Sequence, residues 1–399
     1  MSIQESSRKK LIRRLIKILH IARVILFPSL VLEKIHRAIN HDSLMVYFRY
    51  KHLSLDIHPW FDRYYRTSPV NYCNFKQARC YHWISSPDCL NKKPFVIEPN
   101  DHPLSIVGAL SPVPIEPIDV LKNKRKAIEL VYLNPQCKKI LIESSGQLEL
   151  FERYCPEVLN KCEIVRPGTI PQKENLSNAE SKHAIGRINF LCLASDFTKK
   201  GVDLLLDAWF EFPERKRHQL IVACSFVPKK YKSRVRGENV TFILKSPLSS
   251  KEKEMLYRKA HVVIGPLHID GGANIMEAME YGLPIITMRS QRSNDQVMNN
   301  NGIVVDVPFY FYDEGYGIEW RTWNDFFRLL EIAKSKGGFN ITKEGFVKAL
   351  NFFSKNPDRI SEMGKQSYEL ASNEYSLIKR NQQLLRIYKN ILFDKECVA

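Results

Sequence analysis

The stretch of sequence best suited to bind a charged ligand joins a glycine-rich loop to the start of a helix. An apolar, strand-like run ends at Gly265, and a helix is expected to begin near Ala273. A helix start exposes unpaired backbone N–H groups and the positive end of its dipole, and paired glycines let a phosphate approach them closely. The pattern therefore predicts a diphosphate site. The residues expected to line it are Asp270, Gly271, Gly272, Ala273, Asn274 and Glu277.

Glu277 lies about one turn into this expected helix. A carboxylate in that place can accept hydrogen bonds from ribose hydroxyl groups, as acidic residues do in other nucleotide sites. Gly282 and Pro284 then stop the helix and lead into the next strand. A simpler interpretation stays open, in which the glycines serve only the geometry of a turn.

Alternating strands and helices are expected to position this site. In the second half of the chain, the expected strands cover residues 188–194, 218–224, 239–245, 261–267 and 284–288. The expected helices cover residues 202–212, 249–260 and 273–282. Such alternation predicts an α/β fold with a parallel sheet covered on both faces, in which ligands bind at the carboxyl ends of the strands.

The first half of the chain is less regular. Residues 138–168 give a strand, a helix and a second strand, whereas residues 40–136 hold only short apolar runs. Residues 169–186 are polar and nearly free of apolar periodicity, so we expect the interdomain linker there. The expected parts are an N-terminal helix in 1–38, an N-terminal domain in 39–175 plus 374–399, and a C-terminal domain in 183–373.

The composition fits a two-domain globular protein with a polyanionic partner. The chain has 399 residues, 44% of them hydrophobic, which suffices for two cores of ordinary size. Its 60 Lys and Arg against 43 Asp and Glu give a net charge of +17, which favours nucleic acid, an anionic membrane or phosphorylated substrates. Nine scattered cysteines without a C-x-x-C pair indicate reduced thiols in a cytosolic protein, and no structural metal is expected.

Residues 8–27 are expected to form a basic amphipathic helix. Apolar residues recur there at steps of three and four, opposite most of the lysines and arginines. Such a helix can lie on an anionic membrane, pack on its own domain, or serve as a nucleic-acid arm. No stretch of about 18 uncharged apolar residues exists, so a membrane-spanning helix is not expected. The apolar positions of the helix are Leu11, Leu15, Ile18, Ala22 and Ile25.

Several motifs resemble the retaining GT-B glycosyltransferases of family 4, the glycosyl transferases group 1. That family carries an E-x7-E element followed by A-M-x-x-G-x-P, and the run from Glu277 to Pro284 matches its second half. Asp270 lies one residue after the first acidic position, so the spacing here is D-x6-E. Further stretches are similar to elements of the family in the same order, at residues 138–168, 190–209 and 374–392.

The resemblance implies a catalytic role for Lys200. In the family, the lysine of a K-G motif contacts the donor diphosphate, and Lys200-Gly201 matches that motif. A flexible cation there can neutralise the phosphate charge that grows on the leaving group. The family's Gly-Arg pair is replaced by Ala194-Ser195, so one phosphate cation is missing, and Lys199 or a residue elsewhere can compensate. We count Ser195 and Lys199 among the donor-binding residues, although a solvated surface lysine is the alternative for Lys199.

The resemblance also implies the rest of the fold and the reaction. The fold is GT-B, with two Rossmann-like domains facing across a cleft and a C-terminal helix that crosses back to the N-terminal domain. The reaction moves a sugar from a nucleotide-sugar donor, expected to be a UDP- or GDP-sugar, to a glycan or lipid-linked acceptor with retention of configuration. No cofactor and no metal ion are expected, which agrees with the lack of a D-x-D motif in the chain.

Asp101 and His102 are the catalytic candidates of the N-terminal half. They follow a short apolar run, where a general base or a polar group near the transferred sugar would be placed. Asp and His are also ordinary turn residues, which is the alternative for both.

We expect the acceptor to belong to cell-surface polysaccharide or lipopolysaccharide biosynthesis. The protein is then cytoplasmic and peripheral at the inner face of the membrane, attached through residues 8–27. Two other functions remain open. A nucleic-acid-binding protein would suit the charge, but no recognisable module or interleaved aromatic residues support it. A catalytically idle GT-B scaffold would suit Ser195 and the D-x6-E spacing.

Overall fold

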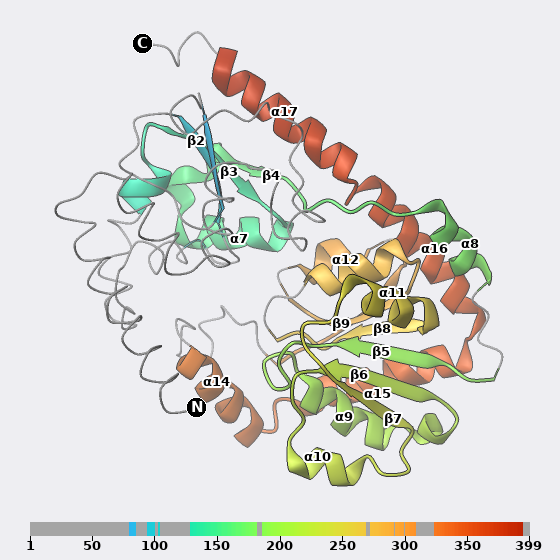
Figure 1. Cartoon of the computed structure of the whole chain (residues 1–399). Helices are drawn as coiled ribbons and strands as arrows, with labels where there is room; N and C mark the ends of the chain where they lie inside the picture. The colour runs from blue at the N-terminus through green and yellow to red at the C-terminus, as the bar shows by residue number, and fades with distance from the viewer. Residues whose placement is uncertain are drawn as a thin grey trace, which may run out of the picture. The chain divides into compact units, whose positions relative to one another are not determined.

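The structure is a computed structural model (Figure 1), and the residues that it describes are 80–84, 94–99, 103, 128–181, 186–268, 272–290, 292–298, 300–308 and 323–393. The chain divides into two compact units, each treated separately below. Within the described ranges, unit 1 comprises the chain up to Ile142, the segment Leu148–Val165 and the chain from Asn381 onward. Unit 2 comprises Glu143–Gln147 and Arg166–Arg380. The expected helix at residues 8–27 and the candidates Asp101 and His102 lie outside the described residues.

Unit 1 is built on a parallel sheet in the order β1-β2-β3-β4. Its central strands are buried apolar runs, which are typical of parallel strands covered on both faces. The strands are β1 (Tyr81–Ile84), β2 (Phe95–Glu98), β3 (Cys137–Ile142) and β4 (Cys162–Ile164). The chain passes between the units four times: after Ile142, within α7 (Ser145–Tyr154), after Val165 and within α17 (Leu377–Phe393). Short helical turns lie at Ile128–Tyr132 and Pro156–Lys161.

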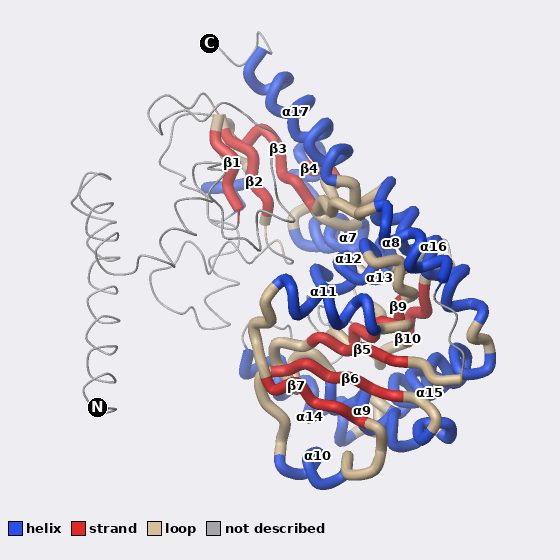
Figure 2. The backbone as a smooth tube through the Cα atoms, turned by 45° about the vertical axis from the view of Figure 1, so that its right-hand side comes forward, coloured by secondary structure: helices blue, strands red, loops and turns tan. Residues whose placement is uncertain are grey.

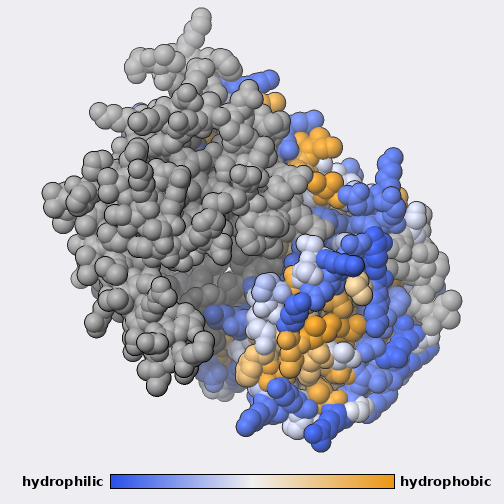
Figure 3. All heavy atoms as spheres, viewed as in Figure 1, coloured by the Kyte–Doolittle hydropathy of each residue, from blue (hydrophilic) through white to orange (hydrophobic). Residues whose placement is uncertain are grey.

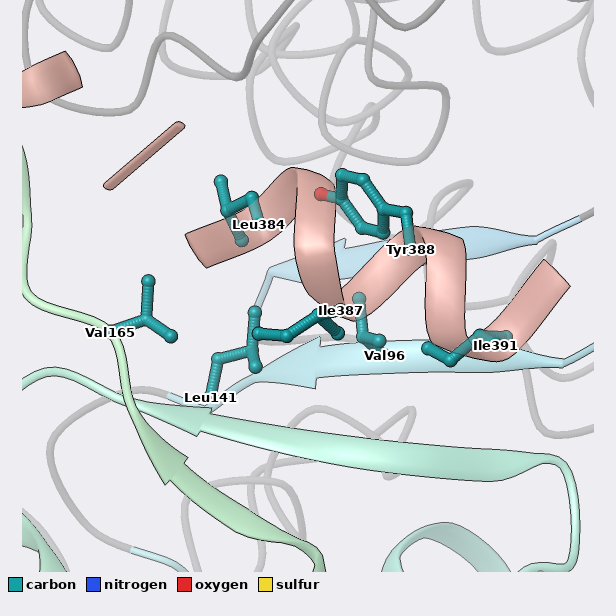
Figure 4. Close-up of a cluster of buried hydrophobic side chains, with 7 residues drawn as sticks. All are labelled: Val96, Leu141, Val165, Leu384, Ile387, Tyr388 and Ile391. Carbon is teal, nitrogen blue, oxygen red and sulfur yellow. The ribbon is translucent and has the colours of Figure 1, made fainter. Parts of the chain in front are cut away.

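The last turns of α17 complete the core of unit 1 (Figure 4). Leu384, Ile387 and Ile391 recur at steps of three and four and form the apolar face of the helix. They are buried together with Val96 of β2 and Leu141 of β3. The C-terminal helix therefore returns to the N-terminal sheet, as the resemblance predicts.

A buried polar chain also joins α17 to this sheet. The Nδ1 atom of His82 lies 2.5 Å from the hydroxyl oxygen of Tyr388, and its Nε2 atom lies 3.0 Å from Oε1 of Glu98. All three side chains are almost wholly buried. Because buried polar groups destabilise a fold unless they are hydrogen-bonded, these contacts favour one position of the helix on the sheet.

Unit 2 is built on a larger parallel sheet in the order β10-β9-β8-β5-β6-β7. Its inner strands β5, β6, β8 and β9 are almost fully buried, whereas β7 lies at an edge and is partly exposed. The strands are β5 (Asn189–Leu193), β6 (Gln219–Cys224), β7 (Val240–Leu244), β8 (Val262–Gly265), β9 (Ile285–Met288) and β10 (Gly302–Val305).

Helices cover both faces of the sheet of unit 2. The described helices of unit 2 are α8 (Lys173–Ser181), α9 (Val202–Glu211), α10 (Lys229–Arg234), α11 (Ser250–Lys259), α12 (Gly272–Glu280), α13 (Ser293–Gln296), α14 (Trp323–Ser335), α15 (Asn340–Lys355) and α16 (Asp358–Asn373). Helices α9 and α15 lie on one face, and α11 and α12 lie on the other (Figures 1 and 2). Helix α16 packs against α12 and α8. The predicted parallel α/β fold is thus confirmed.

Helix α8 lies within residues 169–186, a segment whose sequence shows no helical periodicity. Tertiary contacts hold this short polar helix. It packs against α16, and the buried side chain of Asn175 donates a hydrogen bond to the carbonyl oxygen of Glu280 at 3.0 Å. Such contacts leave no apolar periodicity in the sequence, and for this reason the pattern missed the helix.

The surface of unit 2 mixes apolar and hydrophilic residues. Figure 3 shows apolar residues gathered on one face of the unit and bordered by hydrophilic ones. Phe226, Leu244 and Met255 are large apolar side chains with more than half of their surface exposed. Scattered exposed apolar side chains are ordinary in globular proteins. Among the described residues, no helix is both long enough and apolar enough to cross a membrane.

Two neighbouring leucines of α17 test its packing. We expect Leu384→Ala to lower the free energy of unfolding by about 2 to 5 kcal/mol, the usual cost of emptying a buried site, because this side chain has no exposed surface. Leu385→Ala is the matched control, since Leu385 is 40% exposed and its loss should cost about 0.5 kcal/mol or less. Urea denaturation followed by circular dichroism measures both, and equal losses would contradict the packing described for α17.

Candidate functional site

The order of strands in unit 2 defines where a ligand can bind. Strand β5 lies between β6 and β8, so the chain leaves β5 toward β6 and β7 and later returns to β8 on the other side. Helix α9, which follows β5, and helix α12, which follows β8, lie on opposite faces of the sheet. The carboxyl ends of β5 and β8 are therefore a topological switch point, where ligands of open α/β sheets bind.

The loops after β5 and β8 contact each other closely at this switch point. Gly201 precedes α9 with a φ of 65°, and a Cβ atom at this position would lie 2.2 Å from the carbonyl oxygen of Pro266. The side chain of Asn274 in α12 donates a hydrogen bond to the carbonyl oxygen of Leu193 at 2.9 Å. Only a glycine fits between the loops, and the contact brings Lys200 next to the β8 loop.

The loop after β5 holds its two lysines differently. The backbone N–H of Lys200 donates to the carbonyl oxygen of Asp196 at 3.2 Å, which closes a turn just before α9. The ammonium of Lys199 lies 3.9 Å from the carboxylate of Asp196, and its backbone N–H donates to that carboxylate at 2.9 Å. Ser195 is exposed, and its carbonyl oxygen accepts a bond from Ser225 at 2.7 Å. The structure thus places Ser195, Lys199 and Lys200 at the carboxyl end of β5.

The start of α12 lies at the carboxyl end of β8, as the sequence predicts. The helix begins at Gly272, which is buried, with Ala273 and Asn274 partly exposed in its first turn. The side-chain amide of Gln296 donates to the carbonyl oxygen of Gly272 at 3.2 Å and packs against this glycine. Asp270 and Gly271 lie outside the described residues.

Glu277 lies on α12 but is held by helix α11. Its carboxylate is 3.1 Å from the ammonium of Lys253 through each oxygen, and Tyr257 donates to it at 2.8 Å. The glutamate side chain is only 2% exposed. Sequence reasoning missed Lys253 and Tyr257. Their spacing of four residues places both on one face of a helix, which is the signal that could have identified them.

His268 is a further residue that the sequence did not single out. It lies in the β8 loop, beside Gly201 and edge-on to the ring of Phe339. Burial, with a smaller effect of the ammonium of Lys334, lowers the pKa of His268 to about 3. The imidazole is therefore neutral at physiological pH. The signal available in the sequence was its position two residues before Asp270.

Lys334 also balances a buried carboxylate near this histidine. Its ammonium lies 3.3 Å from Oδ2 of Asp203, in the first turn of α9. Burial raises the pKa of Asp203, and the charge of Lys334 opposes that shift. Lys334 is thus paired with a carboxylate of α9.

The described part of the site suits the binding of an anion. Lys200 supplies a cation, and the start of α12 supplies backbone N–H groups and a helix dipole. Within the described ranges, no three His, Cys, Asp or Glu side chains are grouped so that they could hold a metal ion.

Comparison with known proteins identifies the kind of domain that unit 2 contains. Residues 187–309 match the family model described as glycosyl transferases group 1. The lipopolysaccharide glucosyltransferase WaaG of Escherichia coli (strain K12) is 24% identical over 184 residues, which cover 43% of this chain and 49% of that protein. The chain thus aligns with about half the length of this relative.

Solved structures show the fold. The crystal structure of WaaG, described as a glycosyltransferase involved in lipopolysaccharide biosynthesis, has a TM-score of 0.52 and 16% identity, with 77% of this chain and 78% of that chain covered. Anabaena HepE in complex with UDP has a TM-score of 0.50 and 13% identity, with 75% and 73% covered. The predicted GT-B fold, with two Rossmann-like domains, is confirmed. Lys200 and Glu277 both lie within residues 187–309, the region that matches the glycosyl transferases group 1 model.

A substitution at Gly201 tests the close approach of the two loops. We expect Gly201→Ala to destabilise unit 2 by about 2 to 4 kcal/mol, because it adds overpacking against Pro266 to the cost of a left-handed backbone. Gly237→Ala is the matched control. Gly237 has a φ of 75° with no atom within 4 Å of its added Cβ, so it should lose only about 1 to 2 kcal/mol. Thermal denaturation compares the two, and equal losses would mean that the loops do not touch.

Proposed function

We propose that the protein is a glycosyltransferase that moves a sugar from a nucleotide-sugar donor to a glycan or lipid-linked acceptor. The observation that supports this most directly is that Lys200 and the start of α12 meet at the switch point of a glycosyltransferase domain. The same match favours this function over nucleic-acid binding.

In this proposal, the diphosphate of the donor binds at the start of α12. Lys200 neutralises the negative charge that grows on the leaving diphosphate in the transition state. Glu277, held by α11, receives the ribose, and Asp270 contacts the transferred sugar. The donor carries UDP or GDP, and no metal ion takes part, because the cation and the helix start meet the phosphate charge. Retention of configuration follows from the resemblance to family 4.

The proposed acceptor is a cell-surface polysaccharide or lipopolysaccharide. The resemblance to WaaG supports this assignment, as does the net charge of +17, which suits a phosphorylated or membrane-bound acceptor. The N-terminal domain binds the acceptor, with Asp101 and His102 as catalytic candidates. The protein acts in the cytoplasm, at the inner face of the membrane.

A thermal-shift screen against UDP-, GDP-, ADP- and CMP-sugars tests the donor class. A ligand that binds only the folded protein raises the melting temperature by mass action. Hydrolysis or transfer of the donor that binds then separates an enzyme from an idle scaffold. If none of the donors raises the melting temperature, the proposed function is wrong.

Removal of the Lys200 ammonium should slow the chemical step. We expect Lys200→Ala to lower kcat by the equivalent of about 2 to 4 kcal/mol, the usual loss for one electrostatic group that acts on developing charge. The dissociation constant of the donor should change much less, because the charge on the diphosphate grows only in the transition state. Lys229→Ala, an exposed lysine of α10, is the control. A near-normal kcat for Lys200→Ala would show that Lys200 does not act in the site.

The basic N-terminal segment should attach the protein to membranes. Seven lysines and arginines lie between Arg8 and Arg23, and no acidic residue follows until Glu33. On an anionic bilayer, each contributes on the order of 1 kcal/mol, and the apolar stripe adds burial. We therefore expect deletion of residues 1–27 to release the protein from anionic vesicles while activity on a short soluble acceptor persists. Sedimentation with vesicles measures the bound fraction of the protein. Failure of the wild-type protein to bind anionic vesicles at low salt would refute the attachment.

A further inference from the structure

An ion pair between α11 and α12 lies one turn beyond the proposed diphosphate site. The ammonium of Lys253 is 3.1 Å from both carboxylate oxygens of Glu277, and the hydroxyl of Tyr257 is 2.8 Å from Oε2. Glu277 is 2% exposed, whereas Lys253 is 17% exposed. A ligand that reaches this pair from solvent therefore meets Lys253 as well as Glu277.

The hydrogen bonds of the pair leave one acceptor and one donor unused. Oε2 of Glu277 accepts from Lys253 and Tyr257, and Oε1 accepts from Lys253. An ionised carboxylate has about four lone-pair sites, and an ammonium has three N–H donors. Among the contacts of the described residues, one lone pair on Oε1 and one N–H on Nζ thus remain. A donor beside an acceptor complements a vicinal diol, because each hydroxyl can both donate and accept.

The position of Glu277 on α12 suits an interaction with the ribose of a bound nucleotide. Asn274 is tied to the end of β5 through Leu193, and the hydroxyl of Tyr257 lies 3.2 Å from the carbonyl oxygen of Asn274. Glu277 follows three residues later, about 4.5 Å further along the helix axis. A nucleotide whose phosphates lie at the first turn therefore has its sugar at the level of Glu277.

A purely structural role explains this pair less well. Charges taken out of water lose much of their hydration, so a buried ion pair adds little stability compared with apolar residues of the same size. Glu277 and Lys253 nevertheless lie between two helices that could pack through apolar side chains. A polar ligand that uses both groups accounts for their presence beside the switch point.

We propose that Lys253 is a specificity-determining residue that, with Glu277, binds the cis-diol of the donor ribose. The 3′-hydroxyl donates to Oε1 of Glu277, and the 2′-hydroxyl accepts from Nζ of Lys253. Tyr257 is a positioning residue that fixes the carboxylate. The inference rests on the proposed nucleotide-sugar function and extends it, because it makes the site selective for ribonucleotides over 2′-deoxyribonucleotides.

The test compares binding of a ribonucleotide and its deoxy form by isothermal titration calorimetry. The probes are UDP with 2′-deoxy-UDP and GDP with 2′-deoxy-GDP. Wild-type protein should bind the ribonucleotide about tenfold more tightly, which corresponds to about 1.4 kcal/mol for one hydrogen-bonded hydroxyl. Lys253→Met keeps most of the side-chain stem and should reduce the ratio to about one or two, mainly by weakening the ribonucleotide. Lys253→Arg should restore part of the selectivity.

Controls separate this role from the stability of the fold. Lys251→Met removes an exposed lysine of the same helix and should leave the ratio unchanged. Because Lys253→Met leaves a buried carboxylate without its partner and can unfold the protein, the double variant Lys253→Met/Glu277→Gln provides a neutral pair. It should also show a ratio of about one or two.

The results distinguish this inference from the proposed function. Lys253→Met or the double variant could bind the ribonucleotide and its deoxy form more weakly by the same factor, so that the ratio of the two affinities stays at the wild-type value. In that case Lys253 does not contact the ribose and the inference is wrong. If wild-type protein binds neither UDP nor GDP while another nucleotide-sugar raises its melting temperature, the ratio is measured with that nucleotide and its deoxy form. Absence of binding by every nucleotide would overturn the proposed function itself.

Discussion

The contact of Gly201 with Pro266 is the constraint on which the proposed site depends. Gly201 is the last residue of the loop after β5 and Pro266 is the first residue of the loop after β8. A Cβ atom on Gly201 would lie 2.2 Å from the Pro266 carbonyl oxygen. A left-handed glycine therefore lets α9 begin immediately beside the β8 loop. This close approach places the lysine before Gly201 near the segment that leads into α12. A cation and a helix start that are about seventy residues apart in the sequence thus lie on neighbouring loops of the proposed site.

Burial and ion pairs shape the charge near the switch point. His268 lies in the β8 loop but stays neutral, since burial and Lys334 both lower its pKa. Lys334 is engaged with Asp203, and Lys199 lies near Asp196. In the proposed site, Lys200 acts together with backbone N–H groups, which are fixed dipoles that need no counter-charge. Such preorganised groups stabilise developing charge without rearrangement during the reaction.

The sequence predicted much of unit 2 and little of unit 1, for a physical reason. Buried parallel strands such as β5 and β8 are short apolar runs that end at polar residues or at glycine and proline, so local composition suffices to recognise them. Which strands become neighbours depends on long-range packing, and the meeting of the Lys200 loop with the β8 loop could only be expected from the resemblance. In the sequence, Lys253 cannot be distinguished from the other lysines of a solvated helix, because its partner Glu277 belongs to another helix. Helix α8 was missed for the same reason, since its contact through Asn175 comes from elsewhere in the chain.

The return of α17 to unit 1 has a consequence for synthesis of the protein. Leu384, Ile387 and Ile391 complete a core whose other members, such as Val96 and Leu141, leave the ribosome much earlier. Unit 2 is nearly continuous from Arg166 to Arg380, so all of it emerges before these three residues do. Domains generally fold as units during translation. Unit 2 is therefore expected to fold first. Until the last turns of α17 are made, the apolar face of the N-terminal sheet stays uncovered and accessible to chaperones.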